Sequence, residues 1–159
     1  MTKSLVAYFS ASGITKEVAQ NLSKACGADI YEIEPVIPYS NADLNWMDKE
    51  SRSSVEMRNK SSRPEIKDKD AHIENYDTIY LGFPIWWYVA PTVINTFLEK
   101  YDFSNKKIIL FATSGGSGFG GTVANLKDSV ASSAKIIEGK LLNHNPSVQE
   151  LTDWIKSIN

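Results

Sequence analysis

The chain has 159 residues, of which 42% are hydrophobic and 23% charged, and its formal net charge is −2. This length suits one domain with its own buried core, and the composition is that of an ordinary globular protein. The small net charge excludes a strongly basic nucleic-acid binder, and the composition excludes a disordered or collagen-like chain. We therefore expect a single domain over residues 1–159.

The apolar stretches are short. The longest, residues 79–90, contains Gly82 and Pro84 and is too short to cross a membrane. The N-terminal residues lack the long apolar region and the cleavage site of a signal peptide. Cys26 is the only cysteine, so the chain has no internal disulfide, which fits a reducing compartment. These features predict a cytoplasmic protein that does not bind membranes.

Strand and helix patterns alternate along the chain. Short apolar runs predict five strands, at residues 4–9, 29–33, 78–83, 107–112 and 134–138. Apolar residues at helical spacing predict four helices, with faces formed by Ile14, Val18 and Leu22; by Ile94, Phe97, Leu98 and Tyr101; by Val123, Leu126 and Val130; and by Val148, Leu151, Ile155 and Ile158. This alternation predicts an α/β fold, a doubly wound parallel sheet with helices on both faces.

Residues 38–75 interrupt this pattern, because they are rich in Ser, Asn, Asp and Lys. The segment is either a polar insertion or a peripheral helix, and we expect some helix because structureless loops of this length are unusual in compact domains. Its candidate anchors are Leu44, Met47, Val55 and Met57. We interpret Trp46 as a packing anchor, with a lid over a ligand as the alternative.

The loop after the first strand has the composition of a phosphate site. Ser10, Ser12, Gly13 and Thr15 lie where a strand ends and a helix begins. Helix N-terminal amides are unpaired donors with partial positive charge, and hydroxyls add further donors around an anion. The alternative is ordinary helix capping by Ser or Thr. The P-loop pattern with its Lys is missing, which argues against nucleoside triphosphate hydrolysis.

Two further loops follow the third and fourth strands, at the same expected edge of the sheet. Trp86, Trp87 and Tyr88 follow the third strand, and at least one ring should lie at the surface, where a flat ligand can stack on it or a protein can contact it. The pattern Gly116-x-Gly118-x-x-Gly121, with Glu138 downstream, formally matches a dinucleotide-binding motif. That motif ordinarily opens the first strand–helix unit rather than the fourth.

Other chemical signals are weak. His72 and His144 are isolated from further metal-ligating residues, so we expect surface histidines and no metal site. Cys26 is interpreted as a small core residue.

Taken together, Ser10-x-Ser12-Gly13-x-Thr15, Gly82-Phe83-Pro84-Ile85-Trp86-Trp87 and Thr113-Ser114-Gly115-Gly116 resemble the short, single-domain members of the flavodoxin-like family. The resemblance covers nearly the whole chain. It implies a five-stranded sheet of order 2-1-3-4-5, with flavin mononucleotide (FMN) bound at the carboxyl ends of the strands. The chemistry then belongs to the flavin, and the protein tunes its potential.

The resemblance also implies a role for each loop. The FMN phosphate would be bound by Ser10, Ser12, Gly13, Ile14 and Thr15. One side of the flavin ring would be lined by Pro84, Ile85, Trp86, Trp87 and Tyr88, with Trp86 or Trp87 stacking on it. The polar edge of the ring would be contacted by Ser114, Gly115, Gly116 and Ser117.

The resemblance leaves the reaction open. Carrier flavodoxins are strongly acidic, whereas this chain has a net charge of only −2, and residues 38–75 are longer than the connection requires. Both departures favour an FMN-dependent reductase, of quinones for example, supplied by NAD(P)H, over a carrier with a redox partner protein. The alternatives are a flavin-free nicotinamide-dependent dehydrogenase and a flavin-free interaction module. The sequence is compatible with a monomer or a homodimer.

Overall fold

The computed structural model describes residues 3–11, 13–59, 61–67, 69–86, 89–114, 118–143 and 146–158. Its strands are β1 (Ser4–Tyr8), β2 (Asp29–Glu32), β3 (Thr78–Pro84), β4 (Lys107–Thr113) and β5 (Lys135–Leu141). Its helices are α1 (Ile14–Cys26), α2 (Arg52–Arg58), η1 (Ile73–Asn75, a 3₁₀ helix), α3 (Thr92–Lys100), α4 (Thr122–Lys127) and α5 (Val148–Ile158). No helix among the described residues is long and apolar enough to span a membrane.

The five strands form one parallel sheet of order β2-β1-β3-β4-β5. The predicted class and strand order are therefore confirmed. The central strands β3 and β4 are almost wholly buried apolar runs, as expected of strands covered on both faces. The edge strand β5 is mixed in character and its pairing with β4 shifts register between Ile109 and Phe111. The predicted strand ended at residue 138, because the residues after it are not a continuous apolar run, whereas β5 extends three residues further, to Leu141.

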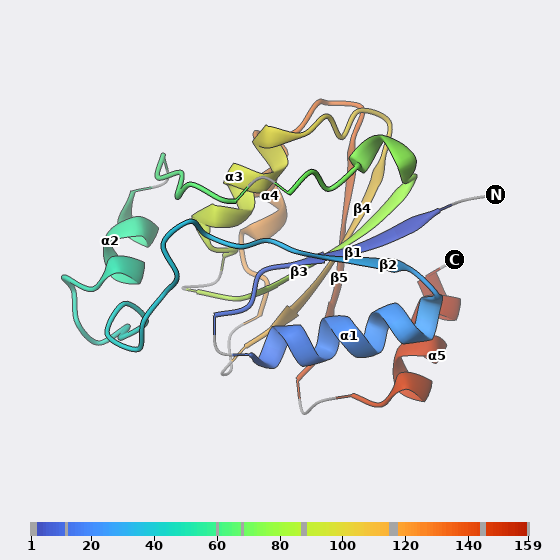
Figure 1. Cartoon of the computed structure of the whole chain (residues 1–159), viewed down its shortest axis with the longest axis horizontal. Coiled ribbons are helices and arrows are strands. Elements are labelled where there is room, and N and C mark those ends of the chain that lie inside the picture. The colour runs from blue at the N-terminus through green and yellow to red at the C-terminus, as the bar shows by residue number, and fades with distance from the viewer. Residues whose placement is uncertain are drawn as a thin grey trace.

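Two apolar cores lie on opposite faces of the sheet (Figure 1). On one face, Val18 and Leu22 of α1 and Leu151 of α5 pack against the sheet. On the other, Ile94 and Phe97 of α3, Leu126 of α4 and Ile73 of η1 pack against it. The central residues of each predicted helix face are buried, whereas Ile14 and Val148, at the helix starts, are exposed. The remaining predicted residues are only partly buried: Tyr101, Val123, Val130, Ile155 and Ile158. Of these, Tyr101 and Val130 lie beyond the ends of α3 and α4. Because α1 and α3 pack on opposite faces, the two helices start on opposite sides of the sheet at its carboxyl edge.

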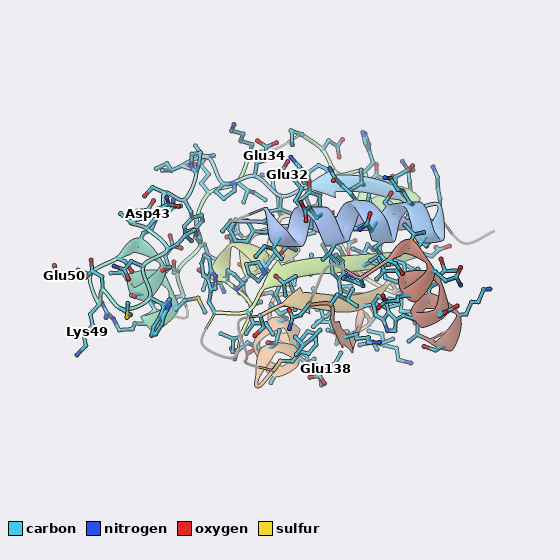
Figure 2. The ribbon with its side chains drawn as sticks, turned by 90° about the horizontal axis from the view of Figure 1, so that it is seen from below. Glu32, Glu34, Asp43, Lys49, Glu50 and Glu138 are labelled. Atoms are coloured by element: carbon cyan, nitrogen blue, oxygen red, sulfur yellow. The ribbon has the colours of Figure 1, made fainter. Side chains whose placement is uncertain are left out.

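The segment 38–75 contains α2, so the expected helix is present (Figure 1). An antiparallel bridge links Pro35, just before this segment, to Ile66 within it. The N-cap of α2 is Ser51, whose hydroxyl accepts a hydrogen bond from the Ser54 amide. Residues 38–59 lie beyond the carboxyl ends of the strands and carry the charged side chains of Asp43, Lys49 and Glu50 (Figure 2).

The predicted apolar anchors of this segment are wrong in part. Trp46 is 69% exposed and Met47 is 74% exposed, and Val55 is exposed as well. The buried side chains of α2 are instead the small hydroxyls of Ser53 and Ser54. Trp46 is therefore not a packing anchor, because most of its side chain is open to solvent.

Candidate functional site

The three predicted loops start side by side at the carboxyl edge of the sheet. Phe9, directly after β1, donates its amide proton to the Gly82 carbonyl of β3 at 3.0 Å. Ile85, directly after β3, donates its amide proton to the Thr113 carbonyl at the end of β4 at 2.9 Å. Parallel strands end at a common edge, and these bonds extend the pairing into the loops. The edge therefore presents the loops as one surface.

Among the described residues, the N-cap position of α1 offers no side-chain cap to the first turn of the helix. Gly13 is the N-cap residue, with a φ of +94°, a conformation that favours glycine, and it has no side chain that can accept from the helix amides. The Ser10 hydroxyl accepts a hydrogen bond from the Gly13 amide at 3.0 Å, which closes the loop. Ile14 is 56% exposed, so the helix start faces solvent. Uncapped N-terminal amides of this kind are suited to bind an anion.

Thr15 joins this loop to β4. Its hydroxyl is 2.8 Å from the hydroxyl of Thr113, and Thr15 is 2% exposed. A pair of hydroxyls uses one proton for the bond between them and keeps the second for another acceptor. The pair therefore fixes the position of α1 against β4 and retains one donor for a ligand.

The loop after β3 makes a tight turn that holds Trp86. The amides and carbonyls of Trp86 and Val89 bond reciprocally, at 3.0 and 3.2 Å. The Trp86 ring lies edge-on to the rings of Phe9 and Tyr39, with centroid distances of 5.9 and 5.4 Å. Phe9 and Tyr39 contact each other at 5.6 Å. The three rings come from the loops after β1 and β3 and from the segment 38–75, and their mutual contacts hold the loop after β3 in place.

Tyr39 connects this aromatic group to α2. Its hydroxyl donates to Glu56, and the Arg52 guanidinium lies 3.9 Å above its ring. Arg52 also forms a 3.0 Å ion pair with Glu56. Burial and the neighbouring Glu56 carboxylate both raise the pKa of Tyr39, which stays protonated and so keeps its donor. Residues 38–59 are thus fastened through Tyr39 to the loops at the carboxyl edge of the sheet.

The loop after β4 is anchored by a residue beyond β5. The Ser114 amide donates to Asn143 Oδ1 at 2.8 Å. A methyl group built on Gly118 or Gly121 would meet no atom within 4 Å, so both glycines border open space. The described part of this loop is therefore held at its start and faces open space further along.

Several predicted site residues lie outside the described part of the chain: Ser12, Trp87, Tyr88, Gly115, Gly116 and Ser117. The described ones, Ser10, Gly13, Ile14, Thr15, Pro84, Ile85, Trp86 and Ser114, are brought together at one edge. Sequence reasoning did not select Thr113, Tyr39 or Asn143 as site residues. Thr113 is the last residue of β4, and Asn143 lies two residues after the end of β5; this position near the carboxyl ends of parallel strands was the available signal.

A cavity of about 220 Å³ adjoins the first loop and is lined by Ser10, Ala11, Tyr39 and two carboxylates, Glu32 and Glu34, which lie close together in Figure 2. Lys67 and Lys69 pair with Glu34 at 3.5 and 2.5 Å. The hydrogen bond from Lys69 lowers the pKa of Glu34. Burial, reinforced by Glu32, raises the pKa of Tyr8 to about 12. These lysines offset the negative charge beside the loop.

The described acidic residue that would support a dinucleotide site, Glu138, is not placed for it. Glu138 lies inside β5, three residues before its end at Leu141, which is roughly 10 Å along a strand. Figure 2 shows Glu138 on the side of the molecule opposite Glu32 and Glu34. The acidic residue that binds a ribose should lie at the carboxyl edge. The position of Glu138 therefore does not suit that role, while Gly116 lies outside the described residues.

One group of potential metal ligands occurs among the described residues: Asp70, His72 and Glu74, all exposed. It lies around η1, which precedes β3, and is therefore at the amino edge of the sheet, away from the loops described above. Exposed acidic groups commonly occur without a metal ion, and this group takes no part in the candidate site.

Comparison with known proteins gives consistent results. A family profile described as flavodoxin matches residues 3–158. A predicted flavoprotein from Bacteroides eggerthii is 44% identical, with a TM-score of 0.91 over 99% of this chain and 98% of that one. A predicted flavoprotein from Bacteroides uniformis is 45% identical, with a TM-score of 0.88 over 98% of each chain.

A more distant structure, a flavoprotein from Lactobacillus acidophilus in complex with FMN, is 23% identical, with a TM-score of 0.70 over 98% of this chain and 99% of that one. At this identity the likeness supports the fold alone. The search of curated proteins found no match.

Proposed function

We propose that this chain, which belongs to the flavodoxin family, binds FMN at the carboxyl edge of its sheet and transfers electrons through the bound flavin. The observation that carries the proposal is the junction of the loops after β1, β3 and β4, fastened by the Thr15–Thr113 pair beside the uncapped start of α1. A flavoprotein of the same fold from Lactobacillus acidophilus has been solved in complex with FMN, which makes FMN the flavin to test first.

The residues present fit FMN. The uncapped amides of α1 and one proton of the Thr15–Thr113 pair supply donors for a phosphate, together with Ser10 and the predicted donor Ser12. The space beside Gly118 and Gly121 and the braced Trp86 suit a flat ring system. When bound, FMN supplies the redox chemistry, and the chain contributes orientation, exclusion of water and the electrostatics around the ring.

In this proposal the phosphate is held by Ser10, Ser12, Gly13, Ile14 and Thr15. The ring is lined by Pro84, Ile85, Trp86, Trp87 and Tyr88, and its polar edge meets Ser114, Gly115, Gly116 and Ser117. A catalytic side chain is not required, because the protein's task is to position the flavin and its reaction partner.

A reductase of a small acceptor is favoured over a protein-to-protein carrier. The net charge of −2 gives little electrostatic steering towards a basic partner. A cavity of about 490 Å³, which touches Val89 after β3 and Gly121 after β4, offers room for a small molecule beside the proposed ring.

The first experiment is a visible absorption spectrum of the purified protein, before and after addition of FMN and desalting. We expect retained flavin bands. A protein that stays colourless and takes up no flavin would overturn the proposal.

The phosphate assignment is tested by comparing FMN with riboflavin, which lacks the phosphate. The exposed side chain of Ile14 allows Ile14→Glu to place a negative charge at the helix start without disturbing the core, with Ile14→Gln as the neutral control. We expect Ile14→Glu to weaken FMN binding about tenfold through charge repulsion and to leave riboflavin binding unchanged. Equal effects on both flavins would place the phosphate elsewhere while leaving flavin binding intact.

A further inference from the structure

Exposed apolar side chains are concentrated in one short part of the chain. Among the described residues, five of the eight large apolar side chains that lie exposed occur between positions 36 and 55: Val36, Ile37, Trp46, Met47 and Val55. The helix α2 and the turns before it project from one end of the molecule, beyond the carboxyl ends of the strands (Figure 1). Single exposed apolar residues are ordinary, whereas a group of them is typical of a surface that binds another molecule.

Two of these side chains form one wall of an open groove beside α2. The groove has a volume of about 690 Å³, and we call it the α2 groove; it is lined by Trp46, Met47, Lys49, Ser54, Met57 and Arg58. Trp46 and Met47 are mostly open to solvent, so the groove would leave much of a small ligand wet. A small-molecule site ordinarily buries about 70–90% of its ligand. A second protein surface covers both walls at once, and the groove therefore suits a protein better.

Backbone hydrogen bonds hold the apolar wall in place. The Ser53 amide of α2 donates to the Asp43 carbonyl at 3.0 Å. The Asp48 amide donates to the Asn45 carbonyl, and the Ser51 amide donates to the Asp48 carbonyl, both at 3.1 Å. These bonds tie the turns that carry Trp46 and Met47 to the start of α2. A preorganised surface of this kind loses little conformational entropy when a partner covers it.

The charges around the groove indicate which partner covers it. Lys49 and Arg58 line the groove, and Lys49 is flanked in the chain by Asp48 and Glu50. Figure 2 shows Lys49 and Glu50 together at the outer end of this segment. A strongly acidic or strongly basic partner would meet charges of its own sign here. A second copy of this chain, related by a two-fold axis, can instead place carboxylates opposite cations in both directions.

The size of the apolar surface is also compatible with a second copy. Burying a large aromatic side chain removes about 150–250 Å² from water, so the exposed parts of two Trp46 side chains contribute roughly 300 Å². That is about a quarter of the ~1,200 Å² of a small specific interface, with Met47 and the charged rim left to add to it. The net charge of −2 causes little repulsion between copies.

We propose that this chain forms a two-fold symmetric homodimer through the α2 groove. In this dimer Trp46 of each copy packs into the groove of the other, and Lys49 and Arg58 face the carboxylates of Asp48 and Glu50 across the axis. The proposal goes beyond the proposed function and does not require flavin, because none of these residues belongs to the proposed FMN site.

The test is sedimentation equilibrium of the full chain, with and without FMN, at protein concentrations up to millimolar. We expect a reversible dimer whose dissociation constant is the same in both forms. We expect Trp46→Ser to raise that constant more than tenfold, because buried tryptophans commonly dominate interfaces. Ile30→Ser is the matched control, since Ile30 is also exposed but lies on the edge strand β2, and it should leave the constant unchanged. Circular dichroism confirms that the variants are folded.

A charge exchange then tests the two-fold arrangement. One variant carries Lys49→Glu with Arg58→Glu, and the other carries Asp48→Lys with Glu50→Lys. Each variant alone presents charges of one sign to its own copy and should be monomeric. An equal mixture of the two should regain the mass of a dimer, because opposite charges then meet across the axis.

Three results would overturn the proposal: an unmodified chain that stays monomeric at every concentration, a dimer that Trp46→Ser leaves intact, or a mixture of the charge variants that stays monomeric. The first would leave the groove to a different protein or to a small ligand. A dimer lost with Ile30→Ser instead would place the interface at β2 and would overturn the proposal as well. Failure of the chain to bind FMN would overturn the proposed function alone, because the association of the FMN-free protein decides this proposal.

Discussion

The hydroxyl pair of Thr15 and Thr113 provides a direct test of how the ligand edge is held together. Both residues are buried and their oxygens are 2.8 Å apart. Replacing one by Val keeps the shape and leaves the other hydroxyl buried without its partner. Such a loss costs about 1–3 kcal/mol of unfolding free energy, whereas replacing both partners by apolar groups of the same shape can be nearly neutral.

We therefore expect Thr15→Val and Thr113→Val each to lower the unfolding free energy by about 1–3 kcal/mol. The double variant should lose less than the sum of the two, with a coupling energy of about 1–2 kcal/mol. The measurement is urea unfolding of the FMN-free protein for all four members of the cycle, because bound ligand would add its own stabilisation.

The same cycle separates stability from ligand binding. If one proton of the pair reaches the FMN phosphate, both single variants weaken FMN binding, and the double variant does not recover that affinity even where it recovers stability. Purely additive losses of stability would show that the two hydroxyls do not interact in solution. Unchanged FMN affinity in all members would show that the pair only positions α1 against β4.

Three other outcomes follow from the described geometry. Gly13→Ala should cost roughly 1–2 kcal/mol in urea unfolding, because an alanine is strained at a φ of +94°, whereas Gly118→Ala should have little effect since its methyl group meets open space. Gly82→Ala should prevent folding to a stable state, because the added methyl carbon would lie 2.1 Å from Phe111 Cζ. We expect the second change Phe111→Leu to restore part of the soluble expression of Gly82→Ala. A lack of rescue would argue against this contact. Tyr8 has an ordinary pKa near 10 when unfolded and about 12 when folded, so its contribution to stability is fully present below pH 10 and is lost as the pH rises towards 12. Tyr8→Phe should flatten the fall in urea midpoint across this range, and identical pH profiles would contradict the assignment.

The sequence was most informative where one physical requirement dominated. Strands β3 and β4 must be apolar on both faces, so their continuous apolar runs located them within one residue. The loops after them followed from the rule that parallel strands end at one edge. The same reasoning missed the part of β5 after Glu138, because an edge strand tolerates polar residues such as Lys140 and so lacks a continuous apolar run.

The parts that could not be predicted depend on contacts between distant segments. Tyr39 is unremarkable in the sequence, and its role arises from contacts with Phe9 and Trp86 together with the Glu56 carboxylate. Trp46 had the opposite outcome: its size suggested a buried position, but the structure leaves it 69% exposed, and the buried residues of α2 are serines. Such outcomes are decided by tertiary packing, which no local pattern records.

The bond between Thr15 and Thr113 spans 98 positions of the chain, and the bond between Ser114 and Asn143 reaches still further towards the C-terminus. During synthesis, β1 and α1 emerge long before the residues that complete the ligand edge. A nascent chain that ends before Thr113 therefore lacks both of these bonds, and pairing over such separations is slow compared with local helix formation. If the chain binds FMN as proposed, tight uptake should then occur late, only after β4, β5 and Asn143 have been added.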